Sequence, residues 1–194
     1  MTNPIGEIVQ SSITEFAAQT LRFGESPPFG SFVKVVDGPG TVYGVVYAVE
    51  SGSLDPGGRP IVRGRDGLRD QAIYEENPDL ELVLRTELRA LSMAHDVNGT
   101  LRVAAPPHPP RLHWSVYACD AAETVRVTES LEYLRVLLAA QDAPVDSLLT
   151  ASIRAACAAR DGDLDFARRA ARDLAVLMKR DYQRLTAIAR ALVD

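Results

Sequence analysis

Short apolar runs separated by glycine and proline fill the first fifty residues of the chain. β-branched and aromatic residues dominate the runs at 5–9, 33–36 and 41–49. Runs of this length and composition are typical of short strands joined by tight turns. We therefore predict about four strands over residues 5–50, with a turn at residues 38–40 before the last of them.

The run from Thr41 to Val49 is apolar on both faces of a strand, because successive side chains of a strand point to opposite sides. One face would hold Val42, Gly44, Val46 and Ala48, and the other Tyr43, Val45, Tyr47 and Val49. This pattern predicts a central strand, or one covered on its outer side by another element. Gly30 and Gly44 are predicted to allow tight bends or close backbone approach.

Residues 51–80 are polar and rich in turn-forming residues. They predict a long surface loop with a short helix near Leu68–Tyr74. Such long loops are often functional or mobile.

Residues 81–104 carry local residues that favour both strand and helix. Asn98-Gly99 is a strong hairpin signal between strands at Leu88–His95 and Thr100–Ala104. The segment His113–Cys119 is predicted as a final strand or a sheet edge.

From about Thr124 the apolar spacing changes to the helical period. The first predicted helix has an apolar face made of Val127, Leu131, Leu134 and Leu138. A second runs from Pro144 to about Arg160, with Leu149, Ile153, Ala156 and Cys157 inward. Gly162 would end this helix, and Asp163 would cap the next.

The last apolar stripe extends from Phe166 to Leu192. A continuous helix of about 30 residues would be roughly 45 Å long at 1.5 Å per residue. That length exceeds what a small barrel can cover, so we expect this helix to project, bend or pack on a partner.

These elements predict an α+β protein, with a small β-barrel over residues 1–122 and an α-helical bundle or hairpin over residues 123–194. The net charge is −5. Residues 1–123 carry 10 basic and 16 acidic side chains, whereas residues 124–194 carry 11 and 10. The barrel half therefore has the wrong sign for a phosphate-binding track.

The N-terminal strands resemble a known small barrel. The order and spacing of the apolar runs are similar to those of the HAS barrel, the N-terminal domain of HerA-type DNA translocases and of rotary ATP-synthase catalytic subunits. The residues that match the pattern are Gly6, Thr14, Phe16, Gly30, Val33, Val35, Gly44 and Val46. The resemblance covers residues 4–50 well and extends more weakly to about 105–119, where it favours strands.

The resemblance implies a fold and no catalytic residues, because this barrel mediates subunit contacts and, in the translocases, docking of a partner nuclease. A P-loop needs a glycine-rich turn before a Lys and a Ser or Thr, and neither Lys34 nor Lys179 has that setting. We therefore expect a stand-alone barrel without the ATPase core. It would be a non-catalytic assembly subunit of a homo-oligomer or of a separately encoded HerA-like ATPase in DNA processing.

Four arginines in the long loop form the candidate contact surface for nucleic acid or a partner. They are Arg59, Arg63, Arg65 and Arg69. With exposed aromatic side chains they would suit single-stranded nucleic acid, which is the first alternative function. They would equally pair with neighbouring acids.

A metal-dependent hydrolase is the second alternative, with His95, His108 and His113 as its candidate ligands. Their spacing does not match a zinc motif, and a strand would send His113 and Cys119 to opposite faces. The acidic run Glu75–Glu81 is more typical of a solvated face than of a two-metal site. We predict no catalytic residue, metal or cofactor.

Asp161-Gly162-Asp163 begins like a calcium loop. Phe166 stands at the loop position that needs Gly, and Arg172 at the one that needs Glu, so we interpret the segment as an interhelical turn.

The two cysteines, Cys119 and Cys157, do not form a disulfide framework. Together with the lack of a signal-peptide pattern and of an apolar membrane span, they predict a cytoplasmic protein.

Overall fold

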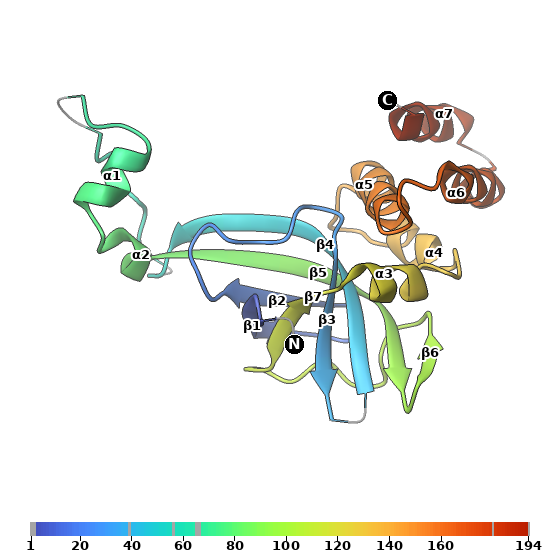
Figure 1. The fold of residues 1–194 in the computed structure, drawn as a ribbon, viewed down its shortest axis with the longest axis horizontal. Coiled ribbons are helices and arrows are strands. Elements are labelled where there is room, and N and C mark those ends of the chain that lie inside the picture. The colour runs from blue at the N-terminus through green and yellow to red at the C-terminus, as the bar shows by residue number, and fades with distance from the viewer. Residues whose placement is uncertain (1–2, 39, 56, 65–66, 180, 194) are drawn as a thin grey trace.

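Six strands close into a β-barrel in the N-terminal half of the chain (Figure 1). The computed structural model describes residues 3–38, 40–55, 57–64, 67–179 and 181–193. The strands are β1 (Gly6–Ser11), β2 (Glu15–Thr20), β3 (Phe32–Asp37), β4 (Gly40–Ser53), β5 (Leu84–Val97), β6 (Thr100–Arg102) and β7 (Ser115–Ala118). Around the barrel the order is β1, β2, β5, β4, β3, β7, and every neighbouring pair is antiparallel.

The strand predictions hold over residues 5–50, where four strands form. The hairpin at Asn98-Gly99 is also confirmed, because it joins β5 to β6. Residues 113–119 contain β7, which pairs with β1 on one side and β3 on the other. β7 is therefore an interior strand of the barrel, not an edge. Pro39 of the predicted 38–40 turn lies outside the described residues.

β4 has two buried faces, as its sequence predicts. Val46 packs inside the barrel with Ile8, Phe16, Val33, Val35 and Val116. Tyr43, Val45 and Tyr47 belong instead to a second core that the barrel shares with the helices. Gly44 lies where a Cβ would come within 3.0 Å of a Phe16 ring carbon, so its predicted close approach is confirmed.

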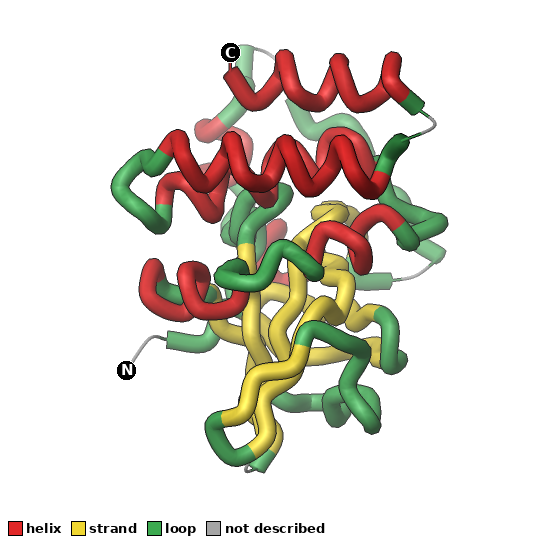
Figure 2. The backbone as a smooth tube through the Cα atoms, turned by 90° about the vertical axis from the view of Figure 1, so that its right-hand side faces the viewer, coloured by secondary structure: helices red, strands yellow, loops and turns green. Residues whose placement is uncertain are grey.

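The helices stack over one side of the barrel as a second layer (Figure 2). They are α3 (Ala121–Val127), α4 (Tyr133–Leu138), α5 (Val145–Ala158), α6 (Leu164–Leu177) and α7 (Tyr182–Val193). The coarse prediction of a barrel followed by helices is therefore correct. Helix begins earlier than predicted, at Ala121, because Asp120 and Glu123 form a reciprocal capping box.

The four residues of the first predicted helical face do pack in the second core, but the single helix predicted for them is wrong. The chain leaves the helix after Val127 and resumes it at Tyr133, so two short helices replace one. Leu137 is fully buried, whereas Leu138 is only partly buried. The predicted inward face of α5 is confirmed at Leu149, Ile153 and Ala156, and Cys157 is only partly buried.

The last apolar stripe does not form one continuous helix of about 30 residues, because the chain turns between α6 and α7. Asp181 Oδ1 accepts a hydrogen bond from the backbone N–H of Arg184 at 3.2 Å, which is the geometry of an N-cap. The turn lets α7 pack against α5 and α6 and bury Ile188. The expected bend is therefore a complete helix break.

Two ion pairs attach α3 to the barrel. Lys34 on β3 pairs with Glu123, and Asp96 on β5 pairs with Arg126, whose guanidinium also donates to the Gly99 carbonyl at 3.0 Å. The hydrogen bond from Arg126 lowers the pKa of Asp96, although burial opposes this change. Burial tends to lower the pKa of Lys34, but its hydrogen bond to Glu123 raises the pKa overall.

Candidate interaction surface on the β4–β5 arm

β4 and β5 are 14 residues long and extend past the barrel as a two-stranded arm (Figure 1). In the described part of the chain β3 pairs with β4 as far as Val45, and β2 pairs with β5 from Glu87 onward. β4 and β5 continue to pair with each other up to Ser53 and Leu84. The predicted loop is therefore shorter at its start, and we call residues 54–83 the arm tip.

The base of the arm is fixed by hydrogen bonds to the loop after β2. Thr86 is almost fully buried; its hydroxyl accepts from the backbone N–H of Gly24 at 2.9 Å and lies 2.8 Å from the hydroxyl of Ser51. Thr20 donates to the Thr86 carbonyl at 3.2 Å. The ring of Phe23 lies 6.0 Å from the ring of Tyr74 in the tip. The arm is therefore held in a defined direction.

The arm tip contains two short helices, α1 (Gln71–Glu76) and α2 (Leu80–Val83). The predicted helix at Leu68–Tyr74 thus exists but lies a few residues further on. Three apolar side chains of the tip are mostly in solvent: Ile61 is 75% exposed, Val62 85% and Leu82 77%. Leu54 and Val83 are exposed as well. Such a concentration of exposed apolar side chains is typical of a protein-binding surface.

Three of the four candidate arginines lie among the described residues, and their surroundings differ. Arg63 donates to Asn77 Oδ1 at 3.0 Å and lies 3.9 Å from an Asp79 carboxylate oxygen. Arg59 and Arg69 are exposed on the tip. Arg65 lies outside the described residues.

The arm tip also carries five exposed carboxylates between residues 70 and 81. They are Asp70, Glu75, Glu76, Asp79 and Glu81, and we call them the acidic arm tip. Their charge weakens the attraction of the arginines for a phosphate backbone. The geometry therefore favours a protein partner over nucleic acid on this surface.

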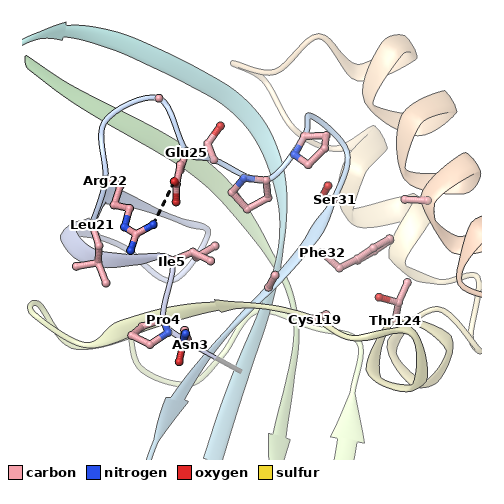
Figure 3. A pocket seen from close by; sticks show the side chains of 16 residues that line it. Asn3, Pro4, Ile5, Leu21, Arg22, Glu25, Ser31, Phe32, Cys119 and Thr124 are labelled. Atoms are coloured by element: carbon pink, nitrogen blue, oxygen red, sulfur yellow. Dashed lines mark hydrogen bonds and ion pairs between the residues drawn. The ribbon is translucent and has the colours of Figure 1, made fainter. Parts of the chain in front are cut away.

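A cleft of about 920 Å³ opens between the N-terminal segment, the loop after β2 and α3 (Figure 3). Phe32, Cys119 and Thr124 line its inner wall, and Arg22 and Glu25 form an exposed ion pair at 3.5 Å on its rim. Burial raises the pKa of the Cys119 thiol to about 12, and the charge of Glu123 adds to this effect. The thiol is therefore protonated at neutral pH and is a poor nucleophile.

A second cleft, of about 610 Å³, lies between the start of β2 and α4. In it the Tyr47 hydroxyl donates to Glu15 Oε2 at 2.6 Å. Burial and this hydrogen bond raise the pKa of Tyr47 to about 12. Tyr47 is therefore neutral at physiological pH, and its hydroxyl holds the Glu15 carboxylate in place.

The candidate metal ligands do not meet. Among the described residues no three His, Cys, Asp or Glu side chains are grouped for a metal ion. His113 Nδ1 lies 2.5 Å from Glu7 Oε1, His95 Nδ1 lies 3.2 Å from the Ala104 carbonyl, and His108 is exposed. Asp163 accepts from the backbone N–H of Asp165 at 2.8 Å as the cap of α6, which confirms the interhelical turn.

No helix in the described ranges has both the length and the apolar character that crossing a membrane requires.

Comparison with known proteins gives no family assignment. No model of a known protein family matches the chain, and no curated protein matches its sequence. The HAS-barrel resemblance therefore stays a prediction, and the function has to be argued from the surface itself.

The exposed apolar side chains of the arm tip escaped the sequence analysis. Ile61-Val62 stands between polar residues and prolines in the loop, which is a usable signal, whereas Leu82-Val83 is part of the apolar stretch Leu80–Leu84 and resembles a buried element. Their exposure depends on the arm leaving the barrel, and the sequence alone does not reveal that.

Proposed function

We propose that this protein is a non-catalytic assembly subunit that binds another protein through the tip of its β4–β5 arm. The observation that supports this proposal is the projecting arm itself, whose tip keeps Ile61, Val62 and Leu82 mostly in solvent. An exposed apolar side chain costs about 1.5–3 kcal/mol relative to its buried state. A partner that covers several of them gains that free energy.

The partner that we propose is a separately encoded HerA-like ATPase in DNA processing. This choice rests on the resemblance of the barrel strands to the HAS barrel, in which the barrel contributes subunit contacts and no catalytic residues. The surroundings of Cys119 and Tyr47, whose raised pKa values keep both groups protonated, are in keeping with a binding role.

The test is reconstitution with the HerA-like ATPase of the same genome. We expect the two purified proteins to elute together in size-exclusion chromatography with light scattering. The triple variant Ile61→Ser, Val62→Ser, Leu82→Ser should weaken the complex at least tenfold, because it removes the exposed apolar side chains and leaves the barrel core untouched.

Val9→Ser, Val36→Ser and Leu112→Ser form the matched control, since these apolar residues are also exposed but lie away from the tip. The control variant should bind like the wild type. Equal binding by the tip variant would refute the arm as the binding surface. Failure of the wild type to bind the ATPase would refute the proposed partner.

A further inference from the structure

The outer side of α6 carries a stripe of basic and apolar side chains. Leu164, Arg168, Arg172 and Val176 follow one another at spacings of four residues, which places them on one face of the helix. Lys179 follows in the turn just after the end of α6 at Leu177. All five are exposed, and Leu164 and Val176 are 64% and 58% in solvent. We call these residues the basic α6 face. The opposite side of α6 is buried through Phe166, Ala170 and Leu174.

The basic α6 face and the acidic arm tip are complementary in charge. Over the whole arm tip, residues 54–83, the sequence has seven acidic side chains and four arginines, and the part from residue 70 to 83 has five acids and no Lys or Arg. From residue 164 to 179 it has four basic and two acidic side chains, and one of the acids, Asp165, pairs with Arg168 at 2.6 Å. The α6 side therefore keeps a smaller positive excess. Both surfaces also offer exposed apolar side chains, Leu82 and Val83 on the tip and Val176 and Leu164 on α6.

The two surfaces lie at opposite ends of the long axis of the molecule. Figure 1 places the arm tip at one end and α6 at the other, and Figure 2 looks onto the end where α6 lies. The arm is fixed at its base through Thr86 and Gly24, so it does not fold back onto its own helices. A contact between these surfaces therefore has to form between two molecules.

We propose that the acidic arm tip of one molecule docks on the basic α6 face of a second copy of this chain. This contact is heterologous, with different surfaces on the two molecules, so it repeats head to tail and builds a ring or an open chain. Opposite charges would orient the encounter, and burial of the apolar side chains would hold the contact. The inference uses the same arm tip as the proposed function but names a second copy of the chain as its occupant. Reversal of charge on α6 separates the two proposals, because it leaves the arm tip unchanged and should therefore not affect binding of the ATPase.

Charge reversal tests the pairing by sedimentation velocity. The wild type should form oligomers that dissociate as the salt concentration rises, because salt screens exposed charges. Glu75→Arg with Glu76→Arg, or Arg168→Glu with Arg172→Glu, should each raise the dissociation constant about tenfold or more, since like charges then face each other. All four substitutions in one chain should restore association.

The matched control is Arg22→Glu with Arg102→Glu, two exposed arginines outside both surfaces, and it should associate like the wild type. A variant with residues 54–83 replaced by Asn-Gly, mixed with the α6 reversal, should give a 1:1 heterodimer, since only one pair of intact surfaces remains. Circular dichroism checks that each variant is folded.

Three results would overturn the proposal: a wild type that is monomeric at every concentration, association that survives either reversal, or a fourfold variant that fails to reassociate although it is folded. Association lost only in the arm variant would point instead to a contact between two arm tips.

Discussion

Gly30, in the loop before β3, is packed closely against α5 of the helical layer. Its φ is +83°, and a Cβ there would lie 2.4 Å from Cβ of Ala151 on α5. Its backbone N–H donates to the Val46 carbonyl at 2.8 Å, so the residue is also tied to β4. Any side chain would separate α5 from the strand beneath it.

We expect Gly30→Ala to lower the free energy of unfolding by about 3 kcal/mol. The left-handed conformation costs an alanine about 1–2 kcal/mol, and the overlap with Ala151 adds to this cost. Urea titration measures the change.

Gly99→Ala is the control for this prediction, because Gly99 has nearly the same φ of +84° with nothing within 4 Å of its Cβ position. Gly99→Ala should lower the free energy of unfolding by only about 1 kcal/mol. Equal costs for the two variants would show that α5 does not press on Gly30.

At the scale of elements, the docking of α3 and the break between α6 and α7 decide how the helices cover the barrel. Polar residues fix both arrangements. Asp96 and Arg126 join β5 to α3, and Asp181 starts α7. The spacing of apolar residues along the chain therefore predicts neither the docking of α3 on β5 nor the break between α6 and α7.

Asp96 makes stability depend on pH. The hydrogen bond from Arg126 lowers the pKa of this carboxyl in the folded state. Its contribution is therefore complete above the ordinary Asp pKa of about 3.9 and is lost as the pH falls through the lowered folded value. We expect Asp96→Asn to cost about 1 kcal/mol at neutral pH, because Arg126 is partly exposed, and to reduce the acid dependence of the melting temperature. The same acid dependence in both proteins would contradict this role.

Asp181→Ala should destabilise α7 by about 1 kcal/mol, the usual value of an N-cap. The neighbouring Gln183→Ala, at an exposed position without a capping contact among the described residues, is the control and should be near neutral. Thermal unfolding followed by circular dichroism at 222 nm compares the two. If Asp181→Ala leaves the stability unchanged, the packing of Ile188 alone determines where the chain breaks between α6 and α7.

At the scale of the whole molecule, the arm tip stands apart from both cores. Ser53 pairs with Leu84, so β4 and β5 remain paired up to the residues that border the arm tip. The arm tip is therefore the connection between two strands that already form a complete antiparallel pair. The core residues of the barrel and of the helical layer lie outside residues 54–83.

Replacement of residues 54–83 by Asn-Gly should therefore leave the fold intact. The two-residue turn suits an antiparallel pair. We expect the melting temperature to fall by no more than about 4 °C, which is roughly the cost of losing the Phe23–Tyr74 contact and the partly buried tip residues. Loss of cooperative unfolding would show that the tip belongs to the folding core.

The sequence determined the elements whose signals are local. The nearly unbroken apolar run at 41–49 predicted a strand buried on both faces, Asn98-Gly99 predicted the β5–β6 hairpin, and Asp163 predicted a helix cap. It also located the candidate arginines, although their relation to the acidic arm tip became clear only in three dimensions. These features depend on neighbours in the chain, so they can be read from spacing.

The tertiary structure alone decided how far β4 and β5 extend, that β7 closes the barrel, and that the last apolar stripe divides into two helices. Each outcome depends on contacts between residues far apart in the chain, such as Ser53 with Leu84 or β7 with β1 and β3. Turn-rich residues after position 50 concealed the strand end, because cross-strand pairing outweighs local propensity. The continuous apolar period concealed the break at Asp181, since both helices bury the same kind of stripe against one core.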